Sequence, residues 1–202
     1  MTTFLFVRHG VTAHTAHKLS GWLPDIPLSE EGRAQVEAAA DSLARVPLTA
    51  VYSSPLDRTM ETAYAIAARH DLEVRPADGI AEVRYGRWTN RSYKALRRTK
   101  LWTTVQRFPS AASFPEGEAL RDVQARAIDE VEGLRAKHRR GNVCCVSHAD
   151  VIRLIAAHYL GVHIDLFQRL HIDPASITAI AVTDEGPRVM AVNVPSRRRA
   201  SR

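Results

Sequence analysis

The chain has 202 residues, of which 45% are hydrophobic, and its formal net charge at pH 7 is +6. A chain of this length can bury enough apolar surface to form a compact domain. No apolar run reaches the roughly 20 residues that a membrane-spanning helix needs, and the first residues lack the basic and then apolar pattern of a signal peptide. We therefore expect a cytoplasmic protein that does not interact with a membrane.

The positive charge is unevenly distributed along the chain. The last eight residues contain four arginines, and the other residues comprise 24 basic and 22 acidic ones. We expect residues 195–202 to form a disordered basic tail. Residues 83–115 contain eight basic residues and no acidic one, which predicts either a lid that attracts an anionic substrate or a solvated helix face. Because the remaining scaffold is acidic, nucleic acid is not an expected partner.

The predicted elements alternate between strands and helices. Strands are predicted at residues 3–8, 49–53, 72–76, 142–147, 177–183 and 188–194, and helices at 30–45, 55–70, 117–139 and 149–160, with a further helix at 92–106. Ser29 precedes two glutamates and a helical spacing of apolar residues, which is typical of a helix N-cap. The alternation predicts an α/β fold, a three-layer sandwich whose mainly parallel central sheet is flanked by helices. We expect one domain over residues 1–194, with a small helical cap insertion at residues 78–116.

The first predicted strand ends abruptly in Arg8, His9 and Gly10. Ligands of α/β sheets bind outside the carboxyl ends of the strands, so these side chains lie where a site can form. The only two cysteines, Cys144 and Cys145, are neighbours within another predicted strand. Their side chains therefore point to opposite faces of the sheet, and we interpret them as two small buried hydrophobic residues.

Four motifs follow one another along the chain, together with shorter loop sequences between them. They are Arg8-His9-Gly10, the segment Ser53 to Ala63 around Arg58, Glu82 with Gly86 and Trp88 behind it, and Val146-Ser147-His148 followed by Ile152-Arg153. In this order they resemble the motifs of the histidine phosphatase superfamily, the phosphoglycerate-mutase-like proteins. The resemblance covers nearly the whole chain and is closest to the short, phosphatase-type branch.

The resemblance implies a phosphomonoester hydrolase that acts on small phosphorylated metabolites through a phosphohistidine intermediate. It implies that His9 attacks phosphorus, that Glu82 is the general acid, and that Arg8, Arg58 and His148 bind the phosphate. Planar arginine forks suit this task because each can hold two phosphate oxygens. No cofactor and no metal are expected, because His14, His17, His158 and His163 do not follow a known metal-ligand spacing.

The chain departs from the family pattern in three places. Thr15 stands where many members have a phosphate-contacting asparagine, Ala149 follows His148 where glycine is commoner, and Thr89-Asn90 replace a usual Glu-Gly pair. We still place Thr15 and Ala149 among the phosphate-binding residues. We further predict that the substrate is lined by Ser20, Gly21, Arg87, Arg97 and Arg98.

Several alternatives remain open from the sequence. Glu61 and Glu116 are competing candidates for the acid. A phosphoglycerate-type mutase is the nearest alternative function, although the 66 positions between Glu82 and His148 resemble the shorter phosphatases. A catalytically idle module that binds an anion or nucleic acid is an alternative of another class. The substrate and the oligomeric state, with a homodimer among the choices, are not predicted.

Overall fold

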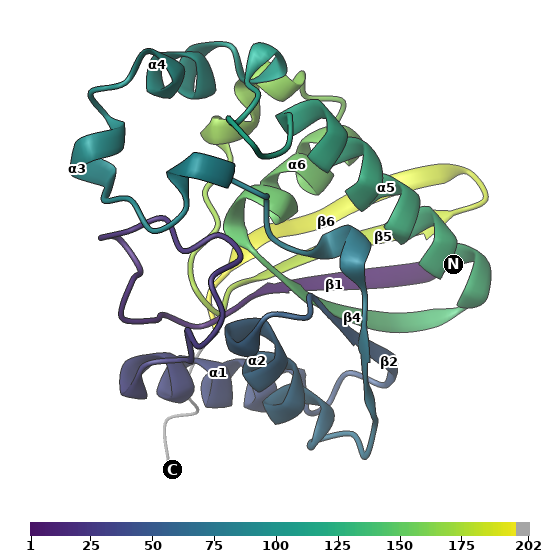
Figure 1. Ribbon diagram of the computed structural model, residues 1–202. Helices are drawn as coiled ribbons and strands as arrows, with labels where there is room; N and C mark the ends of the chain where they lie inside the picture. Colours follow the sequence, from purple (N-terminus) through teal and green to yellow (C-terminus); the bar gives the residue numbers. More distant parts are fainter. Residues whose placement is uncertain (197–202) are drawn as a thin grey trace.

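The computed structural model describes residues 1–196, and the arginines of the predicted disordered tail lie outside this range. Six strands form one sheet in the order β3-β2-β4-β1-β5-β6 (Figure 1). Their bounds are β1 (Thr2–Arg8), β2 (Leu48–Ser53), β3 (Val74–Pro76), β4 (Gly141–Ser147), β5 (Ile177–Thr183) and β6 (Gly186–Val194). Strands β1 to β4 are parallel, and β5 pairs antiparallel with both β1 and β6. The predicted α/β fold with a mainly parallel sheet is confirmed.

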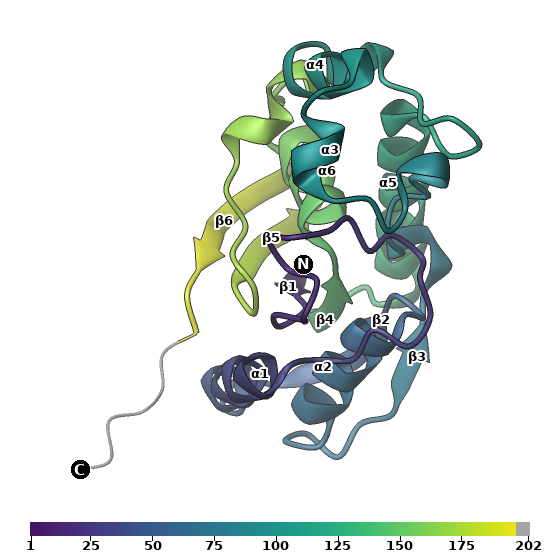
Figure 2. The same cartoon turned by 60° about the vertical axis from the view of Figure 1, so that its left-hand side comes forward.

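Helices cover both faces of this sheet. Helices α1 (Glu30–Leu43) and α2 (Asp57–Ala67) pack together on one face, and α5 (Leu120–Lys137) and α6 (Ala149–Tyr159) pack together on the other (Figures 1 and 2). Helix α1 begins after Ser29, whose hydroxyl accepts a hydrogen bond from the Gly32 amide at 3.1 Å. The predicted N-cap is therefore present, and the three layers agree with the predicted sandwich.

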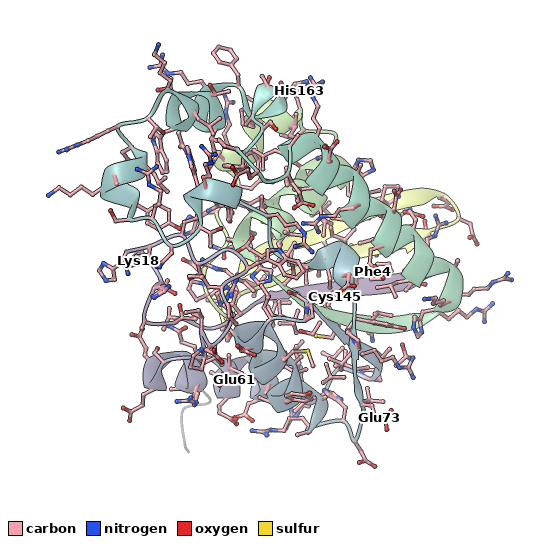
Figure 3. The ribbon with its side chains drawn as sticks, viewed as in Figure 1. Phe4, Lys18, Glu61, Glu73, Cys145 and His163 are labelled. Atoms are coloured by element: carbon pink, nitrogen blue, oxygen red, sulfur yellow. The ribbon has the colours of Figure 1, made fainter. Side chains whose placement is uncertain are left out.

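The two core layers follow from the alternation of side chains along the central strands. On β1, Phe4 and Phe6 are buried against the α5 and α6 side, whereas Leu5 and Val7 belong to the cluster on the α1 and α2 side. Each fully buried side chain of this size contributes on the order of 2 kcal/mol to folding. Phe4 and Cys145 lie in the central layer in Figure 3.

The two cysteines are free and fully buried, and they belong to different core clusters. Burial raises the pKa of the Cys144 thiol to about 12, so it stays protonated. The interpretation of both residues as buried hydrophobic side chains is confirmed.

The segment 78–116 forms a cap of short elements over the carboxyl edge of the sheet. It contains the 3₁₀ turns η1 (Asp78–Ile80), η2 (Gly86–Trp88) and η3 (Pro109–Ala111) and the helices α3 (Tyr93–Leu96) and α4 (Lys100–Arg107). The single helix predicted at 92–106 is wrong, because the chain breaks between α3 and α4. The Thr99 hydroxyl accepts a hydrogen bond from the Trp102 amide at 3.2 Å and thereby starts a new helix.

Aromatic rings form the interior of the cap. The Trp88 ring lies 5.3 Å from that of Phe114 and 6.3 Å from that of Trp102, measured between ring centroids. Gly86 turns the chain with a φ of +51°, and a Cβ at this position would lie 2.0 Å from the Pro115 carbonyl oxygen. Only glycine fits this approach without moving the backbone.

A last 3₁₀ helix, η4 (Ile164–Arg169), joins α6 to β5. Over residues 1–196, no helix combines the length and apolarity that crossing a membrane requires.

Candidate active site

Strand register brings the two histidines to the same edge of the sheet. Arg8 on β1 pairs with Ser147 on the parallel strand β4, so His9 and His148 are the next residues of neighbouring strands. The His9 amide donates to the Ser147 carbonyl at 3.1 Å, and the Ser54 amide, which follows β2, donates to the Val146 carbonyl at 3.0 Å. Three strand ends therefore converge, and the two histidines that the family resemblance assigned to one site lie at the same edge of the sheet.

His9 is held in one tautomer by its own loop. Its Nδ1 lies 2.7 Å from the Gly10 carbonyl oxygen, which can only accept, so Nδ1 carries the proton and Nε2 keeps a lone pair. Burial, and then the charges of Arg58 and Arg8, hold the pKa of His9 well below its usual range. The imidazole is therefore neutral at physiological pH, which is the form that can act as a nucleophile.

The two predicted phosphate-binding arginines present donors that the protein does not use. Arg8 Nη1 donates to the Ile172 carbonyl at 2.7 Å, and Arg58 Nη2 donates to the Gly21 carbonyl at 2.9 Å. The Nε of Arg8 and the Nη1 of Arg58 are buried and have no partner among the described residues. An unpaired buried donor costs about 1–3 kcal/mol, so these arginines favour an incoming anion.

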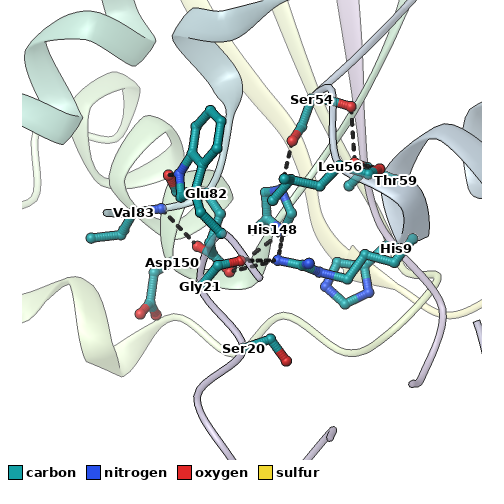
Figure 4. Close-up of polar contacts among 12 residues, drawn as sticks. His9, Ser20, Gly21, Ser54, Leu56, Thr59, Glu82, Val83, His148 and Asp150 are labelled. Carbon is teal, nitrogen blue, oxygen red and sulfur yellow. Dashed lines mark hydrogen bonds and ion pairs between the residues drawn. The ribbon is translucent and has the colours of Figure 1, made fainter. Parts of the chain in front are cut away.

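His148 is fully buried and contacts both Arg58 and Ser54 (Figure 4). Its Nδ1 lies 3.3 Å from Arg58 Nη2, which can only donate, so Nδ1 accepts and Nε2 donates to the Ser54 hydroxyl at 2.8 Å. Burial, followed by the charge of Arg58, lowers the pKa of His148 well below its usual range. The ring centroids of His9 and His148 are 5.2 Å apart. His148 thus orients Arg58, and its direct contact with phosphate stays a prediction.

Glu82, in the cap segment, lies beside Arg58 and His148. Its Oε2 lies 3.6 Å from Arg58 Nη2 and 3.4 Å from His148 Nδ1, and its Oε1 accepts from the Val83 amide at 3.0 Å. Burial is the main cause that raises the pKa of Glu82 to about 7; Arg58 opposes the rise and Asp150 adds to it. A carboxyl group with this pKa can both give and take a proton near neutral pH.

The backbone around Glu82 is fixed by two side chains that sequence reasoning missed as supports. Arg126 on α5 donates to the carbonyl oxygens of Gly79, Ala81 and Glu82, and Trp22 Nε1 donates to the Glu82 carbonyl at 2.6 Å. These contacts join residues more than 40 positions apart, so no local pattern could have revealed them.

The competing acids occupy other places. Glu61 accepts from the Leu28 amide and pairs with Arg33, and Glu116 pairs with Arg87 on the exposed side of the cap. Neither lines the site cavity. The structure therefore favours Glu82 over both.

A cavity of about 600 Å³ opens in front of His9. Its wall includes several residues that the sequence predicted, namely Arg8, His9, Thr15, Ser20, Arg58, Glu82, Arg97 and Ala149. Gly21 contributes its carbonyl to Arg58 instead of lining the cavity. The hydroxyl of Thr15 is occupied by the Thr12 amide, which donates to it at 2.9 Å.

The structure does not bring Arg87 and Arg98 to the cavity. Arg87 is exposed and pairs with Glu116, while Arg98 lies in a separate hollow beside Lys94. Their predicted place in the substrate lining is wrong, because Arg87 on η2 is held by Glu116 on the exposed side of the cap and Arg98, which follows α3, lines the other hollow. Arg97 and Lys18 line both hollows and mark the mouth of the cavity. The aromatic residues Tyr85, Trp88, Tyr93 and Trp102 line it as well.

Sequence reasoning also missed Asp150, and it noted Arg153 only as part of a motif. Both belong to the beginning of α6, directly after His148, and both line the cavity. Their position at the start of a helix that directly follows a strand end was the signal that could have identified them. Within residues 1–196, no three histidine, cysteine, aspartate or glutamate side chains gather closely enough to hold a metal ion.

The chain is similar to known proteins over nearly its whole length. The profile of the histidine phosphatase superfamily (branch 1) matches residues 4–195. Phosphoserine phosphatase 1 of Hydrogenobacter thermophilus is 30% identical over 199 residues, which cover 96% of this chain and 93% of that protein.

Two solved structures have closely similar folds. The structure of Bacillus stearothermophilus YhfR superposes with a TM-score of 0.91 at 24% identity and covers 97% of this chain and 98% of its own. A mycobacterial glucosyl-3-phosphoglycerate phosphatase in complex with VO3 superposes with a TM-score of 0.87 at 25% identity, over 95% of this chain and 99% of its own.

Proposed function

Because the chain belongs to the histidine phosphatase superfamily (branch 1), we propose that it hydrolyses phosphate monoesters of small metabolites through a phosphohistidine intermediate. The observation that carries this proposal is the arrangement around His9. Its Nδ1 is bound to the Gly10 carbonyl, and its Nε2 keeps a lone pair beside two arginines with unused donors. A neutral nucleophile next to fixed cations is what a phosphate dianion requires.

The first step transfers the phosphoryl group to His9. Nε2 attacks phosphorus, and the bond between phosphorus and the leaving oxygen breaks. With a pKa of about 7, Glu82 is about half protonated near neutral pH and more so below it; the protonated carboxyl gives its proton to that oxygen, so the leaving group departs as an alcohol. The Nδ1 contact with Gly10 keeps the ring oriented while it carries the phosphoryl group.

The second step releases inorganic phosphate. Glu82, now a carboxylate, takes a proton from water, and the water oxygen attacks phosphorus as the bond to Nε2 breaks. Both His9 and Glu82 return to their starting protonation states. The same carboxyl group thus acts as acid and then as base, which a pKa near the working pH allows.

Charge on the transferring group is stabilised by the guanidinium groups of Arg8 and Arg58. Removal of a single positioned donor of this kind typically costs about 2.7–4 kcal/mol of transition-state stabilisation. Arg58 is kept in place by the Gly21 carbonyl and His148. The proposed reaction therefore uses side chains of this chain for every proton transfer and needs no metal in any step.

The relatives support hydrolysis as the reaction class. The Hydrogenobacter relative is named as a phosphoserine phosphatase and the mycobacterial neighbour as a glucosyl-3-phosphoglycerate phosphatase. We propose a small phosphorylated metabolite as the substrate of this chain.

The test has two parts. The first measures hydrolysis of p-nitrophenyl phosphate in the presence of a chelator. In the second, the protein is mixed with a ³²P-labelled substrate, the reaction is stopped without acid, and label bound to the protein is measured. We expect phosphate release that the chelator does not change, and a protein-bound label that is stable to base and labile to acid, as a phosphoramidate is. A His9→Ala variant should neither release phosphate nor retain label. Label in that variant, or no hydrolysis by the parent, would refute the proposal. Transfer of label between two hydroxyl groups of a phosphoglycerate without phosphate release would indicate a mutase instead.

A further inference from the structure

The cavity contains a second pair of charged residues besides the catalytic group. Asp150 and Arg153 lie one helical turn apart at the start of α6, and Arg153 Nη1 donates to Asp150 Oδ1 at 2.9 Å. Both line the cavity, together with Glu82. Figure 4 shows Asp150 on the side of Glu82, with His9 on the other side of the site. The pair therefore lies next to the acid, where a leaving group must be.

Arg153 has an unused edge. Its Nη1 is occupied by Asp150, but its Nε is buried and has no partner among the described residues. A guanidinium group binds a carboxylate best through two parallel N–H donors, and the unused Nε belongs to one such edge. Because a buried donor without a partner is costly, this edge favours a negatively charged group of a ligand.

Asp150 is a carboxylate in a cavity that otherwise attracts anions. Its Oδ2 accepts from the Tyr85 hydroxyl at 2.9 Å, and its Oδ1 accepts from Arg153. Two carboxylate oxygens offer about four acceptor sites, so both retain capacity for a further donor. Because Arg153 offsets much of its charge, Asp150 repels an anionic leaving group only weakly, but its oxygens can still accept from an ammonium group, which a purely anionic leaving group does not offer.

We propose that Asp150 and Arg153 form a subsite for the ammonium and carboxylate groups of an α-amino acid, so that the substrate is an O-phosphorylated hydroxy amino acid. This inference rests on the proposed function. The ammonium group binds Asp150, the carboxylate binds the Nε edge of Arg153, and the phosphate faces His9.

The test compares three alkyl phosphates that differ in these groups, with p-nitrophenyl phosphate as a reference for the chemical step. O-phosphoserine carries both charges, 3-phosphoglycerate has a hydroxyl in place of the ammonium group, O-phosphoethanolamine lacks the carboxylate, and p-nitrophenyl phosphate lacks both but has an aryl leaving group. We expect kcat/KM of the parent to be at least tenfold higher for O-phosphoserine than for either of the other two alkyl phosphates. A parent that treats O-phosphoserine and 3-phosphoglycerate alike would overturn the proposal without any variant.

Single substitutions then assign each charge. Asp150→Asn should reduce kcat/KM for O-phosphoserine by a factor at least tenfold larger than for 3-phosphoglycerate, which has no ammonium group. Arg153→Met should reduce kcat/KM for O-phosphoserine by a factor at least tenfold larger than for O-phosphoethanolamine, which has no carboxylate. Arg135→Met serves as the matched control, because Arg135 also forms an i, i+3 pair with an acid, Glu132, but lies outside the cavity. If both cavity variants lose activity on all four substrates by the same factor, the pair is structural and the proposal is wrong.

A binding measurement separates this proposal from the catalytic one. In the His9→Ala background, calorimetry should give a Kd at least tenfold lower for O-phosphoserine than for 3-phosphoglycerate, and Asp150→Asn should remove the difference. If the parent hydrolyses nothing but this preference is found, the proposed function fails and the subsite stands. If the parent hydrolyses p-nitrophenyl phosphate but shows no preference in binding, the subsite fails and the proposed function stands.

Discussion

Replacement of Glu82 by glutamine should make the protein more stable above pH 7 while impairing the reaction. Burial raises the pKa of Glu82 from 4.5 to about 7 in the folded protein. Between these values the folded state holds a proton that the unfolded state has lost, so stability falls as pH rises through this window. Glutamine has no such titration, and its side-chain oxygen can still accept from the Val83 amide as Oε1 does.

The size of the effect follows from the change in pKa. A difference of roughly 2.5 between 4.5 and about 7 corresponds to about 3 kcal/mol at 1.36 kcal/mol per pKa unit. This penalty of the parent is complete at pH 8 and is roughly 1 kcal/mol at pH 5. The variant should therefore gain about 2 kcal/mol relative to the parent when the pH is raised from 5 to 8. A cost that does not depend on pH, such as a change in packing, cancels in this comparison, and the attraction of Arg58 for the ionised carboxylate is already contained in the pKa of about 7.

Urea unfolding followed by the fluorescence of the three tryptophans measures this difference at each pH. The lowered pKa values of His9 and His148 act in the opposite sense, because there the folded state binds fewer protons and stability rises as pH approaches 6.5. Both histidines are present in the parent and in the variant, so their contribution cancels in the stability difference between the two proteins. Glu116→Gln on the exposed cap provides the surface control. A stability difference between Glu82→Gln and the parent that is the same at pH 5 and pH 8 would refute the raised pKa.

Three further predictions concern the nucleophile, the cavity mouth and the cap. His9→Ala should lower kcat at least 1000-fold, with a melting temperature within a few degrees of the parent, and residual turnover of one tenth or more would contradict covalent catalysis. Arg97→Gln should raise KM for a multiply charged phosphate ester several-fold and make that KM depend less on salt concentration. Arg87→Gln, on the exposed side of the cap, should change KM and its salt dependence less. Equal effects of the two substitutions would show that Arg97 does not attract the substrate. Gly86→Ala should destabilise the fold by about 3 kcal/mol or more, because the added Cβ would collide with backbone atoms. Gly161→Ala should cost only about 1 kcal/mol, because Gly161 also has a positive φ but its Cβ would meet no atom. Similar losses of stability in thermal unfolding would show that the cost at Gly86 comes from its backbone φ and not from the collision.

The elements whose cause is local were predictable from the sequence. Strand β1 is an apolar run that ends at His9, and helix α1 carries its own cap at Ser29, so both could be placed within one or two residues. The resemblance implied that His9 and His148 share one site, and the fold explains why they meet, because parallel strands bring their carboxyl ends to one edge of a sheet. The roles of these histidines in the reaction stay predictions until activity is measured.

The cap and the electrostatics of the site depended on contacts between distant segments. Whether a basic side chain of the cap faces the cavity, as Arg97 does, or solvent, as Arg87 does, depends on how the cap docks on the sheet. The raised pKa of Glu82 comes from burial and from Asp150, 68 positions further along the chain. Periodicity and motif order therefore determined the fold class and the candidate residues. Only the tertiary structure decided their burial, their pKa values and the pairing of Asp150 with Arg153 in the cavity, because these properties arise from groups that meet only after folding.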